Sequence, residues 1–95
     1  MNLQDTVSIV TGSSSGVGAA TARMLVERGG RVVINFSRSA DAAQKVAAEC
    51  DALGGEVLLC QADVSRDEDC RRMVDEALAK WGRLDVLVNN AGTTK

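Results

Sequence analysis

The 95-residue sequence contains no proline, histidine or tyrosine, and its aromatic residues are one tryptophan and one phenylalanine. Without proline, repeats or a low-complexity tract, nothing in the chain marks a linker, so we expect one small domain. Few aromatic residues remain for a core, yet 45% of the residues are hydrophobic and 25% are charged. This composition is typical of a globular protein.

The sequence also lacks a charge excess and a long apolar run. Its formal net charge of -2 argues against nucleic acid as a partner, because nucleic-acid-binding proteins present a basic face. No apolar run is long enough for a membrane span. Residues 1–10 show neither the basic start nor the long apolar run of a signal peptide. We therefore expect a cytoplasmic chain without a membrane partner.

Three cysteines stand at evenly spaced positions, Cys50, Cys60 and Cys70. No C-x-x-C pair is present, histidine is absent and the odd number leaves one thiol unpaired. Buried free thiols in a reducing compartment are favoured over a metal site or a disulfide. We expect no metal site.

Short apolar runs alternate with longer segments of helical periodicity along the whole chain. Strands are predicted at 6–10, 31–36, 56–62 and 84–89, and helices at 16–28, at 40–53 and between 65 and 82. Strands that are apolar throughout and separated by helices predict a parallel sheet covered on both faces. The predicted fold class is α/β, with Rossmann-type βαβ units.

Glycines and small polar residues are expected to end and begin the helices. Gly29 with Gly30, Gly54 with Gly55, and Gly82 end the three helices. Ser39 is the expected cap of the second helix, and the sequence SRDE predicts a capping box in which Ser65 is the N-cap and Glu68 reaches back. The second helix is expected to bury Ala43, Val46, Ala47, Cys50 and Leu53, and the third Cys70, Met73, Val74, Ala77 and Trp81.

The first strand is followed by the glycine-rich stretch TGSSSGVG at 11–18. A helix N-terminus carries unpaired N–H groups and a partial positive charge, which suit phosphate. We expect Gly12 to permit the tight turn, Gly16 the close approach of a pyrophosphate, and Gly18 the packing of the helix on the sheet. Ser13, Ser14 and Ser15 can add hydroxyl donors. The stretch is not a P-loop, since no lysine stands in it, and a purely structural turn is the alternative.

A second motif, NNAG at 89–92, follows the fourth strand. Together with T-G-x-x-x-G-x-G at 11–18 and Asp-Val at 63–64, it resembles the short-chain dehydrogenase/reductase family over the whole chain. The run NNAGTTK is most similar to bacterial 3-oxoacyl-acyl-carrier-protein reductases. The resemblance implies a three-layer Rossmann-type sheet with strand order 3-2-1-4, in which the first two helices cover one face and the third covers the other.

The resemblance also implies which residues bind a nicotinamide cofactor. The first turn would hold the phosphates and the adenosine ribose through Gly12, Ser13, Ser14, Ser15, Gly16, Val17 and Gly18. Asp63 would contact the adenine amino group with Val64 beside it, although a plain loop carboxylate is the alternative. Asn90, Ala91 and Gly92 would line the ribose side, and Asn89 would form structural hydrogen bonds.

In this family the end of the second strand selects between NAD and NADP. An acidic residue there binds the ribose 2′-hydroxyl and repels a 2′-phosphate. Here the position is Phe36, followed by Ser37 and Arg38, and a guanidinium suits phosphate oxygens. We therefore predict NADP(H), although Ser15 occupies a position where some NADP-binding members of the family carry a basic residue. A solvated surface charge is the alternative for Arg38.

The family transfers hydride between the cofactor and a carbonyl or alcohol with a Ser and a Tyr-x-x-x-Lys pair. The sequence has no tyrosine and ends three residues after Gly92, whereas family members run to about 250 residues. We therefore expect an N-terminal fragment: residues 1–95 as an NADP-binding half-domain that lacks the catalytic and substrate-binding half and contains no catalytic residue.

Two further functions stay open: a stand-alone, non-catalytic nucleotide-binding module, and a purely structural domain. The full-length protein would act on a small carbonyl or alcohol, with a 3-oxoacyl thioester as one option, and would form homo-oligomers. The fourth strand would be an exposed apolar edge, so the 95 residues alone are expected to be marginally stable, dimeric or aggregating.

Overall fold

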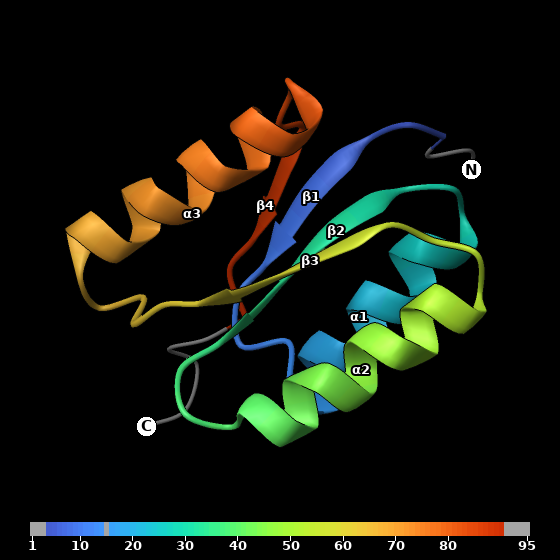
Figure 1. Cartoon of the computed structure of the whole chain (residues 1–95), viewed down its shortest axis with the longest axis horizontal. Coiled ribbons are helices and arrows are strands. Elements are labelled where there is room, and N and C mark those ends of the chain that lie inside the picture. The colour runs from blue at the N-terminus through green and yellow to red at the C-terminus, as the bar shows by residue number, and fades with distance from the viewer. Residues whose placement is uncertain (1–3, 15, 91–95) are drawn as a thin grey trace.

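The computed structural model describes residues 4–14 and 16–90, which form four strands and three helices in strict alternation (Figure 1). The elements are β1 (Val7–Val10), α1 (Gly16–Glu27), β2 (Arg31–Phe36), α2 (Ala40–Ala52), β3 (Val57–Gln61), α3 (Asp67–Trp81) and β4 (Val86–Val88). Each lies within one or two residues of its predicted position. The β-branched runs form the strands, and glycines separate most helices from the next strand.

The four strands form one parallel sheet in the order β3-β2-β1-β4, as predicted. Ile9 of β1 is paired with Val33 of β2 on one side and with Leu87 of β4 on the other. Because all strands run in one direction, their carboxyl ends lie at the same edge of the sheet (Figure 1). The fold is the predicted Rossmann-type three-layer arrangement.

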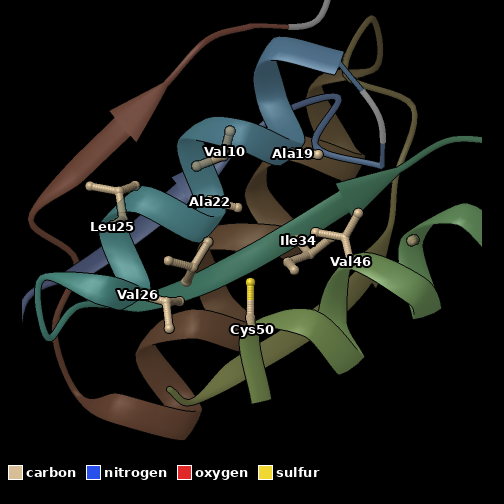
Figure 2. Close-up of a cluster of buried hydrophobic side chains, with 10 residues drawn as sticks. Val10, Ala19, Ala22, Leu25, Val26, Ile34, Val46 and Cys50 are labelled. Carbon is tan, nitrogen blue, oxygen red and sulfur yellow. The ribbon is translucent and has the colours of Figure 1, made fainter. Parts of the chain in front are cut away.

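Helices α1 and α2 cover one face of the sheet. Leu25 and Val26 of α1, Val46 and Cys50 of α2 and Ile34 of β2 belong to one cluster on this face (Figure 2). These side chains are buried, and together with their neighbours on β1 and β2 they form one of two hydrophobic clusters. Burial of a large aliphatic side chain contributes about 1.5–3 kcal/mol, so this cluster is a main source of stability.

Helix α3 alone covers the other face (Figure 1). Its residues Met73 and Ala77 form the second hydrophobic cluster with Val33, Cys60 and other buried residues. Cover is incomplete beside β4, the edge strand: Val86 and Leu87 are 42% and 59% exposed. The predicted exposed apolar edge is therefore present, while the predicted self-association stays a prediction. No helix within the described ranges has the length and hydrophobicity needed to cross a bilayer.

The glycine helix ends are confirmed, whereas the capping box is wrong. Gly29, Gly54 and Gly82 have φ values of 93°, 86° and 74°, the left-handed region that favours glycine. Helix α3 begins at Asp67, and its N-cap residue makes no side-chain cap hydrogen bond. The Ser65 hydroxyl instead donates to Asp63 Oδ1 at 2.6 Å. A nearby carboxylate accepts a stronger hydrogen bond from the hydroxyl than a neutral acceptor would.

The position of Leu53 differs from the prediction, whereas the three cysteines are free thiols as expected. Leu53, expected on the inward side of α2, lies beyond the last residue of that helix and is 45% exposed. The three cysteines are free: Cys50 and Cys60 are buried, and Cys70 is half-buried. Burial is the main cause that raises the pKa of Cys60 to about 11, so this thiol is inert at neutral pH.

Candidate functional site

The carboxyl edge of the sheet brings together segments that are far apart in the sequence. The β1–α1 turn, the end of β2, the residues after β3 and the residues after β4 all lie at this edge (Figure 1). In such sheets ligands bind outside the carboxyl ends of the strands. Ser15, Ala91 and Gly92, three of the predicted cofactor-binding residues, lie outside the described ranges, and the others can be placed.

The β1–α1 turn has the conformation that its glycines allow. Gly12 and Gly16 have φ values of 60° and 59°, which side chains rarely adopt. A Cβ atom on Gly16 would have no described atom within 4 Å, so the space in front of α1 is open. The first turn of α1 contains no acidic residue, unlike those of α2 and α3. An anion there would meet the positive end of a helix dipole and the N–H groups that a helix N-terminus leaves without intrahelical partners.

Gly18 allows a close contact, although its partner differs from the predicted one. A Cβ atom here would collide with the carbonyl oxygen of Gly12 and lie 2.8 Å from Asn90 Nδ2. The prediction placed this contact between the helix and the sheet. The structure places it between α1, the turn that precedes it and the side chain that follows β4. Gly18 therefore determines how closely the helix N-terminus approaches the turn.

The serines of the turn have different environments. Ser13 is fully buried, and its hydroxyl donates to Val10 O at 2.7 Å and accepts from Asn35 N at 2.9 Å. Its backbone N–H also donates to Asn35 O, at 3.0 Å. Both donors of Ser13 are thus used within the protein, and its contact with a cofactor stays a prediction. Ser14 is half-buried and Val17 is 73% exposed.

Thr11 connects the two motifs that carry the resemblance. Its hydroxyl oxygen accepts from Asn90 N at 2.8 Å, and it lies 3.3 Å from both Val88 O and Asn89 Oδ1. The predicted structural role of Asn89 agrees with this contact. The Asn90 side chain donates to Gly12 O at 3.3 Å. No role was predicted for Thr11, although its place at the end of β1 is the signal that could have indicated one.

Asn35, near the end of β2, is a second residue that the sequence analysis missed. It is 2% exposed, and its Oδ1 accepts from Gly12 N at 2.9 Å. Its Nδ2 donates to Cys60 O at 3.3 Å and to Ala62 O at 3.2 Å. A buried polar side chain must find partners within the protein. An asparagine in an otherwise apolar strand is the only signal that could have pointed to it.

The carboxylate of Asp63 lies just past the end of β3. Its Oδ1 accepts from Ser65 Oγ at 2.6 Å and from Ser65 N at 3.0 Å. These hydrogen bonds, with smaller contributions from the charges of Arg66 and Arg38, lower the pKa of Asp63, so it is ionised at neutral pH. Asp63 N donates to Asp69 Oδ2 at 2.8 Å, which anchors this segment to α3.

The residues after β2 present a cation to the same edge. Phe36 is half-buried against the α1–α2 cluster, whereas Ser37 and Arg38 are exposed. The Ser37 carbonyl accepts from Gln61 Nε2 at 3.1 Å, which ties this loop to β3. The charge of Arg38 makes the smallest of the contributions that lower the pKa of Asp63.

One cavity borders the predicted site, and a larger one lies away from it. Val64 lines an apolar cavity of about 300 Å³ on the α3 face, with Ile9, Met73 and Leu87 among the other walls. A larger cavity, of about 650 Å³, lies at the amino edge of the sheet and contains none of the predicted site residues. Phosphate binding to a turn needs no enclosed cavity, so the predicted site and these cavities do not conflict. Among the described residues no group of three or more potential ligand side chains could hold a metal ion.

Comparison with protein families matches residues 6–95 to the family described as short chain dehydrogenase. One similar protein is a 3-oxoacyl-[acyl-carrier-protein] reductase from Synechocystis, which is 45% identical over 89 residues. That alignment covers 94% of this chain and 36% of the relative. The chain spans about a third of the length of the curated relatives it matches.

Similar solved structures include complexes with both nicotinamide cofactors. A short-chain dehydrogenase from Burkholderia cenocepacia in complex with NADP has a TM-score of 0.93 and 41% identity, covering 100% of this chain and 39% of its own. A 7α-hydroxysteroid dehydrogenase complexed with NADH has a TM-score of 0.87 and 33% identity, covering 93% of this chain and 34% of its own. The fold is thus compatible with either cofactor.

Proposed function

The chain belongs to the short-chain dehydrogenase family, and we propose that it binds NADPH as the cofactor-binding part of an oxidoreductase. Members of this family bind nicotinamide cofactors. The proposed reaction of the whole protein is hydride transfer between NADPH and a ketone or secondary alcohol. When bound, NADPH would supply the hydride, while the residues of this chain bind and orient the cofactor.

The β1–α1 turn is the observation that carries the proposal. Its glycines hold a left-handed backbone, and the first turn of α1 lacks acidic residues and faces open space at Gly16. These features fit a pyrophosphate, which needs N–H donors and the absence of side chains. Gly12, Ser14 and the N-terminus of α1 would hold the phosphates, with Ser15 as a further predicted ligand. Asp63 and Val64 would hold the adenine.

The preference for NADPH over NADH is based on Arg38. No acidic residue occupies positions 36–38 to repel a 2′-phosphate. The side chain of Arg38 is exposed, and its charge is among the causes that lower the pKa of Asp63. A 2′-phosphate on an adenosine held at Asp63 would thus come within reach of a cation. Arginine can form two parallel hydrogen bonds to phosphate oxygens.

The proposed substrate class is a 3-oxoacyl thioester or a related ketone. The support comes from the Synechocystis relative, named a 3-oxoacyl-[acyl-carrier-protein] reductase, at 45% identity. The 95 residues include no tyrosine, so the family's tyrosine acid/base is not among them. We propose that Asn90, Ala91 and Gly92 line the ribose side of the cofactor in the reaction, and that the whole protein is a homo-oligomer.

Titration of the chain with NADPH and NADH by isothermal calorimetry tests the proposal. We expect NADPH to bind more tightly, and Arg38→Ala to weaken NADPH by about tenfold, since a hydrogen bond to a charged group contributes about 1.5–3 kcal/mol and exposure reduces this. NADH binding should not change. Arg71→Ala removes an exposed arginine that pairs with Asp67 on α3, and it serves as the matched control.

Each outcome of the titration has a distinct meaning. A loss of NADPH affinity below about threefold in Arg38→Ala would contradict the assignment of NADP. Equal effects of Arg38→Ala and Arg71→Ala would indicate a general charge effect. If the folded chain bound neither cofactor, the proposed binding function itself would be wrong.

A further inference from the structure

The buried amide of Asn35 links two parts of the carboxyl edge that a dinucleotide would have to span. Its Oδ1 accepts from Gly12 N in the β1–α1 turn, at 2.9 Å. Its Nδ2 donates to Cys60 O and Ala62 O, at 3.3 and 3.2 Å, and Ala62 is the residue before Asp63. One side chain of β2 therefore contacts both neighbouring strand ends.

The backbone of Asn35 strengthens the same connection. Asn35 N donates to Ser13 Oγ at 2.9 Å, and Ser13 N donates to Asn35 O at 3.0 Å. Asn35 and Ser13 are both fully buried, so these hydrogen bonds are shielded from water. Breaking a buried hydrogen bond leaves the other partner unsatisfied, which costs more than the bond contributes. The turn therefore cannot shift relative to the end of β3 without breaking several bonds of this kind.

We propose that Asn35 is a positioning residue, which holds the phosphate-binding turn and the Asp63 segment at the separation that one cofactor molecule requires. This inference rests on the proposed function. Asn35 contacts neither the adenine nor the phosphates and acts through Gly12 N and through Ala62. Because the two halves of the site are held in advance, a cofactor that spans them does not have to order them on binding.

A positioning role for Asn35 predicts a result that a role in stabilising the fold alone does not. Inorganic pyrophosphate probes the turn, adenosine 2′-monophosphate probes the Asp63 side, and NADPH spans both. Removing the Asn35 amide should weaken NADPH by about tenfold or more, the equivalent of one lost hydrogen-bond contribution, while each fragment weakens much less. A merely structural residue would lower the folded fraction and leave the affinities of the folded chain unchanged.

Val33→Ala is the matched control for Asn35→Ala. Val33 is buried on the same strand, two residues earlier and therefore on the same face of the sheet, but it contacts the α3 cluster and not the turn. Both variants should melt at lower temperature. Only Asn35→Ala should lose affinity for NADPH, and only in this variant should the Gly12 amide exchange with solvent at least about tenfold faster relative to the strand amides.

A measurement on the unaltered chain does not depend on a variant that folds. Pyrophosphate added alone should shift the NMR signals of the Asn35 side-chain amide and of the Asp63 backbone amide, although it contacts only the turn. Unshifted signals, or NADPH affinity retained in folded Asn35→Ala, would overturn the inference and leave the proposed function intact. If NADPH did not bind at all, the proposed function would fail, and selective loss of Gly12 protection would still decide whether Asn35 positions the turn.

Discussion

The backbone N–H of Asn90 donates a 2.8 Å hydrogen bond to the hydroxyl of Thr11, which lies 79 residues earlier in the sequence. The same hydroxyl lies 3.3 Å from Asn89 Oδ1. Thr11 is 4% exposed, so its end of these contacts is buried. They join the segment after β1, an interior strand, to the segment after β4, the edge strand. The glycine-rich turn and the two asparagines after β4 are therefore parts of one structural unit.

We expect Thr11→Val to lower the free energy of unfolding by about 1–3 kcal/mol. Valine has nearly the shape of threonine but offers no oxygen to Asn90 N, so a half-buried donor loses this hydrogen bond. Urea denaturation followed by circular dichroism measures the change. Thr11→Ser keeps the hydroxyl and should cost less. Unchanged stability in Thr11→Val together with a loss in Thr11→Ser would show that the methyl group matters and the hydrogen bond does not.

Gly18→Ala should impair the turn more than its small change in volume suggests. The added methyl group would collide with Gly12 O and come within 2.8 Å of Asn90 Nδ2, so backbone would have to move. We expect a loss of about 1–3 kcal/mol in stability, together with at least about a tenfold loss in NADPH affinity. Thermal melting and calorimetry measure the two effects.

The control for Gly18→Ala is Gly54→Ala at the end of α2. Gly54 has a φ of 86° and open space around its position, so alanine there costs about 1–2 kcal/mol of backbone strain without touching the turn. This variant should lose stability and keep its NADPH affinity. If Gly18→Ala bound NADPH as well as Gly54→Ala, the close contact at Gly18 would have no role in binding.

The stability of the chain should fall in acid partly because of Asp85. Hydrogen bonds from Arg83 and from Val7 N lower the pKa of this carboxyl group. With a pKa lower in the folded than in the unfolded state, Asp85 stabilises the fold above the unfolded value of about 4. This stabilisation is lost as the pH falls through the folded value.

Asp85→Asn tests this pH dependence. We expect the variant to be less stable than the unaltered chain at pH 7 and the difference to shrink as the pH falls below about 4. Urea titrations at several pH values measure it. Asp75→Asn, at an exposed position on α3, is the control and should leave the pH profile unchanged. A difference between Asp85→Asn and the unaltered chain that stayed constant with pH would contradict the assignment.

Most of the fold could be predicted because its signals are local. The β-branched runs that became β1 and β2 and the glycines at 29, 54 and 82 all act through their immediate neighbours. The errors arose where competing partners decided the outcome. Ser65 was expected to cap α3, but the carboxylate of Asp63 lies within reach and accepts the hydrogen bond of its hydroxyl. Leu53 followed the helical periodicity, but α2 ends at Ala52.

The candidate site divides in the same way. Glycine at 12 and 16 and the cation at 38 are visible in the sequence, because a left-handed backbone and a phosphate require particular residue types. Two hydrogen bonds, Thr11–Asn90 and Gly12–Asn35, join residues that only the parallel sheet brings together. The same is true of the close approach of Gly18 to Asn90. The sequence by itself thus determined the elements, their order and the chemistry of the turn. Tertiary structure decided which buried polar groups became partners, because that choice depends on strand order and register rather than on neighbouring residues in the chain.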